Sequence, residues 1–232
     1  MQKYLKNTYV VGVANIFKKE MGIFLVTGRS SCVLQPKLIM KGYSKKKLKK
    51  WASGIKRSDK DSFDQLFRLL YPRLKRYARS YTHDSGTASD LVQDAFVSLW
   101  QKRSSIKPEK SISSYLFMSV RNKALNHIRD YQDKVSHFNP DYEQIEDTSN
   151  QIFTIHNVDR SAEKLASHFK TWINDLPSRQ KEAFTLSRFD GFDHEEIAAI
   201  MDISPNTVNN HIMAALEYLR TKYQQHKDSN YG

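Results

Sequence analysis

Five polar side chains close to residue 210 have the types and spacing needed to form hydrogen bonds with nucleic-acid bases. They are Asn206, Thr207, Asn209, Asn210 and His211. Carboxamides and hydroxyls donate and accept hydrogen bonds, as contact with base edges and phosphates in a DNA major groove requires. Asparagine is a poor helix former, so helix propensity does not account for three of them here. The alternative interpretation is an ordinary solvated helix face.

The surrounding residues predict a helix-turn-helix that would position these side chains. Asp193 is expected to cap a first helix, whose apolar residues are Ile197, Ala198 and Met201. Ser204 is a suitable N-cap for the second helix, and Pro205 suits its first position. The second helix has an apolar stripe of period 3.6 that would pack on the first: Val208, Ile212, Ala215, Leu216 and Leu219. The N-terminal turns of such a second helix point into the major groove.

Composition favours a nucleic-acid partner. The 232 residues have a formal net charge of +12 and a pI near 9.6, which indicates a polyanionic partner. The single cysteine, Cys32, excludes an internal disulfide and a cysteine-rich zinc site. No apolar segment reaches the roughly 20 residues that a membrane span requires, and no signal peptide is evident. We therefore expect a cytoplasmic protein.

The sequence contains no set of residues typical of catalysis. It lacks glycine-rich phosphate loops and the H-E-x-x-H metal motif, and its eight histidines are scattered. His194, Glu195 and Glu196 are adjacent, but adjacent residues point around a helix rather than to one face. Glutamates in a first turn are also favoured by the helix dipole. We predict no enzymatic activity, no cofactor, no metal and no small-molecule substrate.

The N-terminal half of the chain changes character twice. Residues 1–42 lack a sustained period and form an extension of unknown structure; a natural start at Met40 is an alternative. Lys41 to Lys60 is expected to be a solvated basic face or arm. Helical periodicity then predicts three helices: one capped by Ser62 and interrupted by Pro72, one over about 87–103 and one over about 113–129.

The C-terminal half is predicted to be a separate helical domain. Residues 138–160 are acidic and contain helix breakers, so they are expected to form a flexible linker. Helices resume at Ser161, and Ser178 is expected to cap the next one. The tail beyond Tyr223 is polar and expected to fray. The predicted fold is all-α, with the domain boundaries 43–137 and 161–226 and a tail at 227–232.

Three segments, taken together and in order, resemble the extracytoplasmic-function group of bacterial sigma factors, the promoter-recognition subunits of RNA polymerase. The segment DLVQDAFVSLW, residues 90–100, is similar to the part of region 2 that docks on the polymerase. FMSVRNKALNHIR, residues 117–129, is similar to the part that opens and contacts the minus-ten element. LPSRQKEAF, followed by FDGFDHEEIAAIMDISPNTV, is similar to region 4, which contacts the minus-thirty-five element.

The resemblance implies a sigma factor with core RNA polymerase, promoter DNA and an anti-sigma factor as partners. Residues 43–137 would be the region 2 domain and residues 161–226 the region 4 domain. The polymerase contact would be formed or supported by Asp90, Leu91, Gln93, Asp94, Phe96 and Trp100. The minus-ten DNA would be contacted by Arg121, Asn122, Asn126 and Arg129, and the minus-thirty-five DNA by Asn206, Thr207, Asn209, Asn210 and His211.

Two departures and two rival functions accompany the resemblance. Many family members have Lys or Arg where this chain has Asn209, His211 and Ala214, which predicts weak DNA binding by this unit alone. The first 40 residues have no counterpart. The main rival is a stand-alone helix-turn-helix regulator with a helical sensor domain, and a second rival is a helical adaptor that does not contact DNA.

Overall fold

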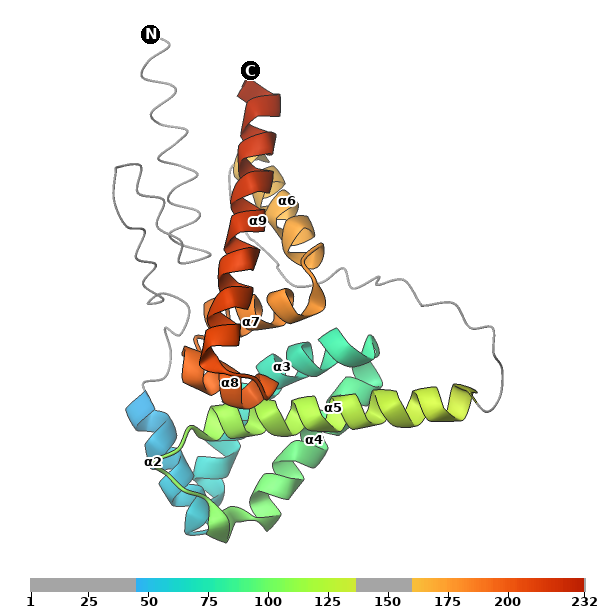
Figure 1. The fold of residues 1–232 in the computed structure, drawn as a ribbon. Coiled ribbons are helices and arrows are strands. Elements are labelled where there is room, and N and C mark those ends of the chain that lie inside the picture. Colours follow the sequence, from blue (N-terminus) through green and yellow to red (C-terminus); the bar gives the residue numbers. More distant parts are fainter. Residues whose placement is uncertain (1–44, 137–159, 232) are drawn as a thin grey trace. The chain divides into compact units, whose positions relative to one another are not determined.

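The computed structural model describes residues 45–136 and 160–231, and in both ranges the chain is helical without a strand (Figure 1). It divides into two compact units, one built on α2–α5 and the other on α6–α9. The prediction of an all-α fold with two helical domains is confirmed. The predicted extension, 1–42, and nearly all of the predicted linker, 138–160, lie outside the described residues. No helix in the described ranges is long and apolar enough to cross a membrane.

Three helices form the core of the N-terminal unit. They are α3 (Lys60–Thr82), α4 (Ser85–Gln101) and α5 (Ile112–Ser136), and each packs against the other two. Their contacts bury one apolar stripe from each helix, because apolar residues recur every three or four positions. The fully buried side chains include Leu66, Leu70, Leu74, Val92, Leu99, Leu116 and Val120.

The start and the middle of α3 differ from the prediction. Asp59, not Ser62, is the N-cap: its carboxylate accepts a hydrogen bond from the backbone N–H of Asp61 at 3.1 Å, and the Ser62 hydroxyl also donates to it. These bonds, the one from Ser62 first, hold the pKa of Asp59 below its ordinary value. Pro72 lies inside α3 and does not end it.

The basic segment before α3 is a packed helix rather than a solvated arm. Helix α2 (Lys45–Lys56) buries Leu48, Trp51, Ala52 and Ile55 and packs against α3, α5 and a short 3-10 helix, η1 (Arg103–Ser105). Its apolar residues are only four, but they recur at helical spacing, which places them on one face. The expected solvated basic face is therefore confirmed for residues 45–56, where all six lysines are exposed, but it belongs to a packed helix and not to an arm.

The bounds of α4 and α5 also differ from those expected from periodicity. Helix α4 begins at Ser85, two residues before the predicted start, because the carboxylate of Asp84 caps it by accepting a hydrogen bond from the backbone N–H of Thr87 at 2.6 Å. This bond is the main cause of the lowered pKa of Asp84. Helix α5 continues seven residues past the predicted end at Arg129, to Ser136.

The C-terminal unit consists of α6 (Arg160–Asn174), α7 (Ser178–Arg188), α8 (His194–Met201) and α9 (Pro205–Tyr231). Helix α9 packs against α6 and α7. Pro177, not Ser178, occupies the N-cap position of α7, and no side chain caps this end. The tail beyond Tyr223 remains helical to Tyr231, where fraying was expected.

Candidate nucleic-acid interface

Helices α8 and α9 each begin with a side-chain N-cap, as predicted. The Asp193 carboxylate accepts from the backbone N–H of Glu196 at 2.9 Å, and the Glu196 carboxylate accepts from that of Asp193 at 3.1 Å, which is a capping box. Ser204 accepts from the backbone N–H of Thr207 at 3.1 Å, and Pro205 is the first residue of α9. Asp202 has a φ of 56° in the turn between the helices. The Ser204 cap and the turn at Asp202 therefore set the direction in which α9 begins.

The first two turns of α9 present three carboxamides to solvent. Asn206, Asn209 and Asn210 are exposed and lie at positions i, i+3 and i+4, which share one helix face. Thr207 is half-buried, and its hydroxyl lies 2.8 Å from that of Ser204. His211 is also half-buried. The structure thus brings the three asparagines together and places Thr207 and His211 beside the buried stripe.

One exposed apolar residue on this face was missed by sequence reasoning. The side chain of Met213 is 50% exposed, although the residues of the stripe on either side of it, Ile212 and Ala215, are buried. Position 213 follows Asn209 by four and Asn210 by three, so it shares their face. Met213 is apolar but does not fall on the period of the buried stripe, and this mismatch could have identified it from the sequence.

Three of the four predicted minus-ten residues lie on one exposed face of α5. Asn122, Asn126 and Arg129 are exposed at i, i+4 and i+7, and the Arg129 Nη2 donates to Asn126 Oδ1 at 3.2 Å. Arg121 is only 4% exposed. Its position is in phase with Phe117, Val120 and Ala124, which are buried in the stripe that faces the core. The structure therefore separates Arg121 from the other three.

The C-terminal turns of α5 extend past the part of the helix that packs in the core (Figure 1). From Leu125 to Gln132 no residue is buried, and Asn126, His127, Arg129 and Asp130 are exposed. Tyr131 lies among them with 60% of its side chain exposed. An aromatic ring at such a position can stack on an unpaired base. Sequence reasoning missed Tyr131 because it lies beyond the predicted end of this helix.

The predicted polymerase-contact residues on α4 fall into two groups. Phe96 is buried and packs against Phe67, with ring centroids 4.8 Å apart, and Trp100 packs against Phe63 at 5.1 Å. These rings support the helix from within. Asp90, Gln93 and Asp94 are exposed and Leu91 is half-buried, so they form the outer surface. Val97, which was not predicted, is 54% exposed and extends this surface by one turn.

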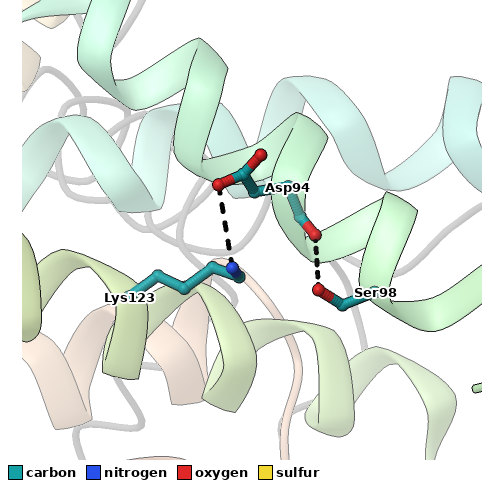
Figure 2. Close-up of polar contacts among 3 residues, drawn as sticks. All are labelled: Asp94, Ser98 and Lys123. Carbon is teal, nitrogen blue, oxygen red and sulfur yellow. Dashed lines mark hydrogen bonds and ion pairs between the residues drawn. The ribbon is translucent and has the colours of Figure 1, made fainter. Parts of the chain in front are cut away.

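One ion pair links this surface to α5. Lys123 Nζ lies 3.7 Å from the Asp94 carboxylate (Figure 2). The Ser98 hydroxyl donates to the backbone carbonyl of Asp94 at 2.8 Å, so only the carboxylate of Asp94 engages Lys123. Both charged side chains are partly exposed, and such pairs contribute about 0–1 kcal/mol. The pair aligns the two helices without burying a charge.

The described residues hold no cluster of three or more histidine, cysteine, aspartate or glutamate side chains that could bind a metal ion. His194, Glu195 and Glu196 occupy the first turn of α8, where Glu196 is used in the capping box.

Two family models match the chain. Residues 66–134 match the model described as sigma-70 region 2, and residues 170–219 match sigma-70, region 4. The first match contains α4 and most of α3 and α5, and the second contains the helix-turn-helix.

Curated relatives match over most of the chain. The extracytoplasmic-function RNA polymerase sigma-E factor of Escherichia coli (strain K12) is 27% identical over 175 residues, which cover 73% of this chain and 91% of that protein. The RNA polymerase sigma-H factor of Pseudomonas aeruginosa is 23% identical over 167 residues, 70% of this chain and 86% of that protein.

Solved structures show the same helical fold. The sigma factor RpoE of Bartonella quintana, in complex with the anti-sigma factor NepR, matches with a TM-score of 0.56 and 26% identity over 70% of this chain and 96% of that one. CnrH, in complex with the cytosolic domain of CnrY, matches in fold with a TM-score of 0.51 and 21% identity, over 77% of this chain and 98% of that one.

Proposed function

The chain belongs to the extracytoplasmic-function group of bacterial sigma factors, and we propose that it recognises a promoter through two separate exposed helix faces. As a sigma factor it binds core RNA polymerase and directs promoter-specific transcription initiation. In our proposal, α9 contacts the minus-thirty-five element, α5 contacts the minus-ten element and α4 docks on the polymerase.

The observation that carries this proposal is the exposed asparagine face of α9. Asn206, Asn209 and Asn210 project from the capped N-terminus of the second helix of a helix-turn-helix. A carboxamide can form two hydrogen bonds with adenine in the major groove. Thr207 and His211 lie beside this face, and we propose that their polar atoms contact DNA phosphates. Met213 adds an apolar group suited to a thymine methyl.

For α5 we propose contacts with opened DNA. Asn122, Asn126 and Arg129 offer amides and a guanidinium on one face, and Tyr131 offers a ring. Extruded bases need polar and stacking partners of this kind. Arg121, which sequence reasoning placed among these contacts, is buried, so we assign it a positioning role.

For α4 we propose a surface supported from inside. Asp90, Gln93, Asp94 and Val97 would contact the polymerase, with Leu91 at the edge. Phe96 and Trp100 would act indirectly, by holding the helix on α3 through Phe67 and Phe63. An acidic surface of this kind is complementary to basic residues of a partner.

Two weak DNA-binding units on one chain raise the overall affinity only when the distance between them matches the distance between the two promoter elements. The polymerase would hold the two units at that separation. Strand opening would use binding energy alone, which is consistent with a chain that acts as a sigma factor rather than an enzyme. We also propose a cytoplasmic location, and an anti-sigma partner by analogy with RpoE, which was solved bound to one.

Transcription in vitro with core polymerase tests the function. We expect the chain to direct initiation from a subset of candidate promoters that core polymerase alone does not use. A stand-alone regulator would instead bind a palindromic site without polymerase and would confer no initiation. That second result would refute the proposal.

The role of α5 is tested by Asn122→Ala. Loss of one hydrogen bond, about 1 kcal/mol, should lower the extent of promoter opening by about fivefold. Polymerase binding should be unchanged, because Asn122 is not on α4. Gln65→Ala, an exposed amide on α3, serves as the matched control. Permanganate footprinting measures opening, and equal losses of opening and polymerase binding would contradict the assignment.

A further inference from the structure

Helix α2 presents a strongly basic surface that the proposed function does not use. Six of its twelve residues are lysine, and none is acidic. Lys45, Lys46, Lys47, Lys49, Lys50 and Lys56 are all exposed. Helical spacing places Lys46, Lys49 and Lys50 opposite the buried residues Leu48, Trp51, Ala52 and Ile55. Lys45, Lys47 and Lys56 lie at the edges of the buried face, where Lys47 Nζ is 5.2 Å from the centroid of the Trp51 ring. The helix is therefore fixed to the fold by one face and displays only positive charge on the other.

This arrangement is unfavourable for the helix itself. Lys45, Lys46 and Lys47 stand in the first turn, where the helix dipole disfavours cations. Lys45 and Lys49, and Lys46 and Lys50, are like charges four residues apart, and each such pair costs about 0.2–0.5 kcal/mol. A face that served solubility alone would mix both signs of charge. An anionic partner would relieve both effects.

The position of α2 in its unit favours DNA as that partner. Helix α2 packs against α5 and against η1. Lys102 and Lys107, which are close to η1 in the sequence, are also exposed. Helix α5 has 25 residues and is therefore about 37 Å long. One turn of duplex DNA spans about 34 Å. The duplex that flanks DNA opened at α5 can therefore run along a unit of this size, to which α2 is fixed.

We propose that the lysine face of α2 binds the phosphate backbone of promoter DNA without regard to its sequence. This inference depends on the proposed function in one respect, which is that the anionic partner is DNA. The lysines would supply the fixed charge that the recognition face of α9, with its neutral asparagines, lacks. They would hold the DNA near the chain while α9 and α5 select the sequence.

The test replaces Lys46, Lys49 and Lys50 by glutamine in the full-length chain. Binding to a fluorescent duplex of mixed sequence is followed by anisotropy between about 50 and 200 mM salt. Each lysine that neutralises a phosphate contributes about 0.9 to the slope of log affinity against log salt, so the triple variant should lose up to about 2.7. The matched control, Lys46→Arg/Lys49→Arg/Lys50→Arg, keeps the charge and should keep the slope.

Glutamine has nearly the helix propensity of lysine, and the triple change removes repulsion, so its melting temperature should not fall. The single variants Lys46→Gln and Lys50→Gln, each expected to lose about 0.9 of slope, give an independent measure.

An unchanged slope in all the glutamine variants would overturn the inference. So would tighter DNA binding by the triple variant, because removing three cations that contact phosphates cannot raise the affinity for DNA. Loss of binding to phosphatidylserine vesicles with unchanged DNA binding would assign the face to a membrane instead. None of these measurements requires polymerase, so failure of the transcription assay would refute the proposed function and leave this result standing.

Discussion

Gly54 provides a sharp test of how tightly α2 is packed on α3. A Cβ at this position would lie 2.2 Å from the Ser62 hydroxyl oxygen, 2.8 Å from Ser62 Cβ and 2.9 Å from an Asp59 carboxylate oxygen. These atoms belong to the first turn of α3, whose N-cap is Asp59. Gly54→Ala would therefore disturb the helix contact and the cap together.

Replacing an ordinary helical glycine by alanine raises the free energy of unfolding, whereas we expect Gly54→Ala to lower it. Alanine should gain about 1 kcal/mol of helix propensity. Overpacking costs about 1–3 kcal/mol, and disturbing the Ser62–Asp59 hydrogen bond costs a further 0.5–1.5 kcal/mol or so. We expect a net loss of about 1–3 kcal/mol, at about 4–8 °C of melting temperature per kcal/mol for a unit of this size.

Unfolding in urea measures the loss of unfolding free energy. A Trp172→Phe background leaves Trp51 and Trp100 as the fluorescent reporters, and both belong to the N-terminal unit. Gly86→Ala is the matched control, because the nearest atom to its Cβ would be an Asp84 carboxylate oxygen at 3.2 Å. It should be neutral or slightly stabilising. If Gly54→Ala is as stable as Gly86→Ala, the packing argument is wrong.

Two further predictions concern the C-terminal unit. Asn209→Ala should reduce discrimination at the minus-thirty-five element by about 1–3 kcal/mol, measured as relative initiation from promoters that differ at single positions, and unchanged preference would remove Asn209 from the contact set. Burial, together with the nearby His168 at a ring distance of 4.5 Å, lowers the pKa of His226 below its ordinary 6.5. Because the unfolded chain then binds the proton more readily, the α6–α9 contact should be fully stable above that value and lose stability as the pH falls below it. Melting of this unit between about pH 8 and 5 measures the effect, which His226→Leu should flatten.

Local patterns predicted the helix-turn-helix correctly. Its caps depend on residues three positions apart, as in Asp193 with Glu196 and Ser204 with Thr207. Such contacts need no knowledge of the rest of the fold. The asparagine face followed because a stripe of period 3.6 leaves the remaining positions exposed.

Features decided by distant packing were predicted poorly. A proline inside a helix costs about 3 kcal/mol, but Leu66, Leu70 and Leu74 form one buried stripe across Pro72, and each buried leucine contributes about 1.5–3 kcal/mol. Continuing α3 therefore outweighs the local cost.

Arg121 shows the same limit at the candidate site. Its charge indicated an exposed side chain, whereas its register with Phe117 and Ala124 placed it in the buried stripe. Residue type and periodicity disagreed at this position, and periodicity was the better guide to its location.

The exposed C-terminal turns of α5 affect how the sequence of this protein can evolve. The buried residues of α5 are found up to Ala124, whereas Asn126, Arg129 and Tyr131 are exposed. Exposed substitutions away from packed positions usually alter stability by less than about 0.5 kcal/mol. Under the proposed assignment of these residues to the minus-ten contact, promoter preference can therefore drift by mutation while the fold is retained. Duplicated copies of such a gene could then acquire new target promoters without first acquiring a more stable scaffold.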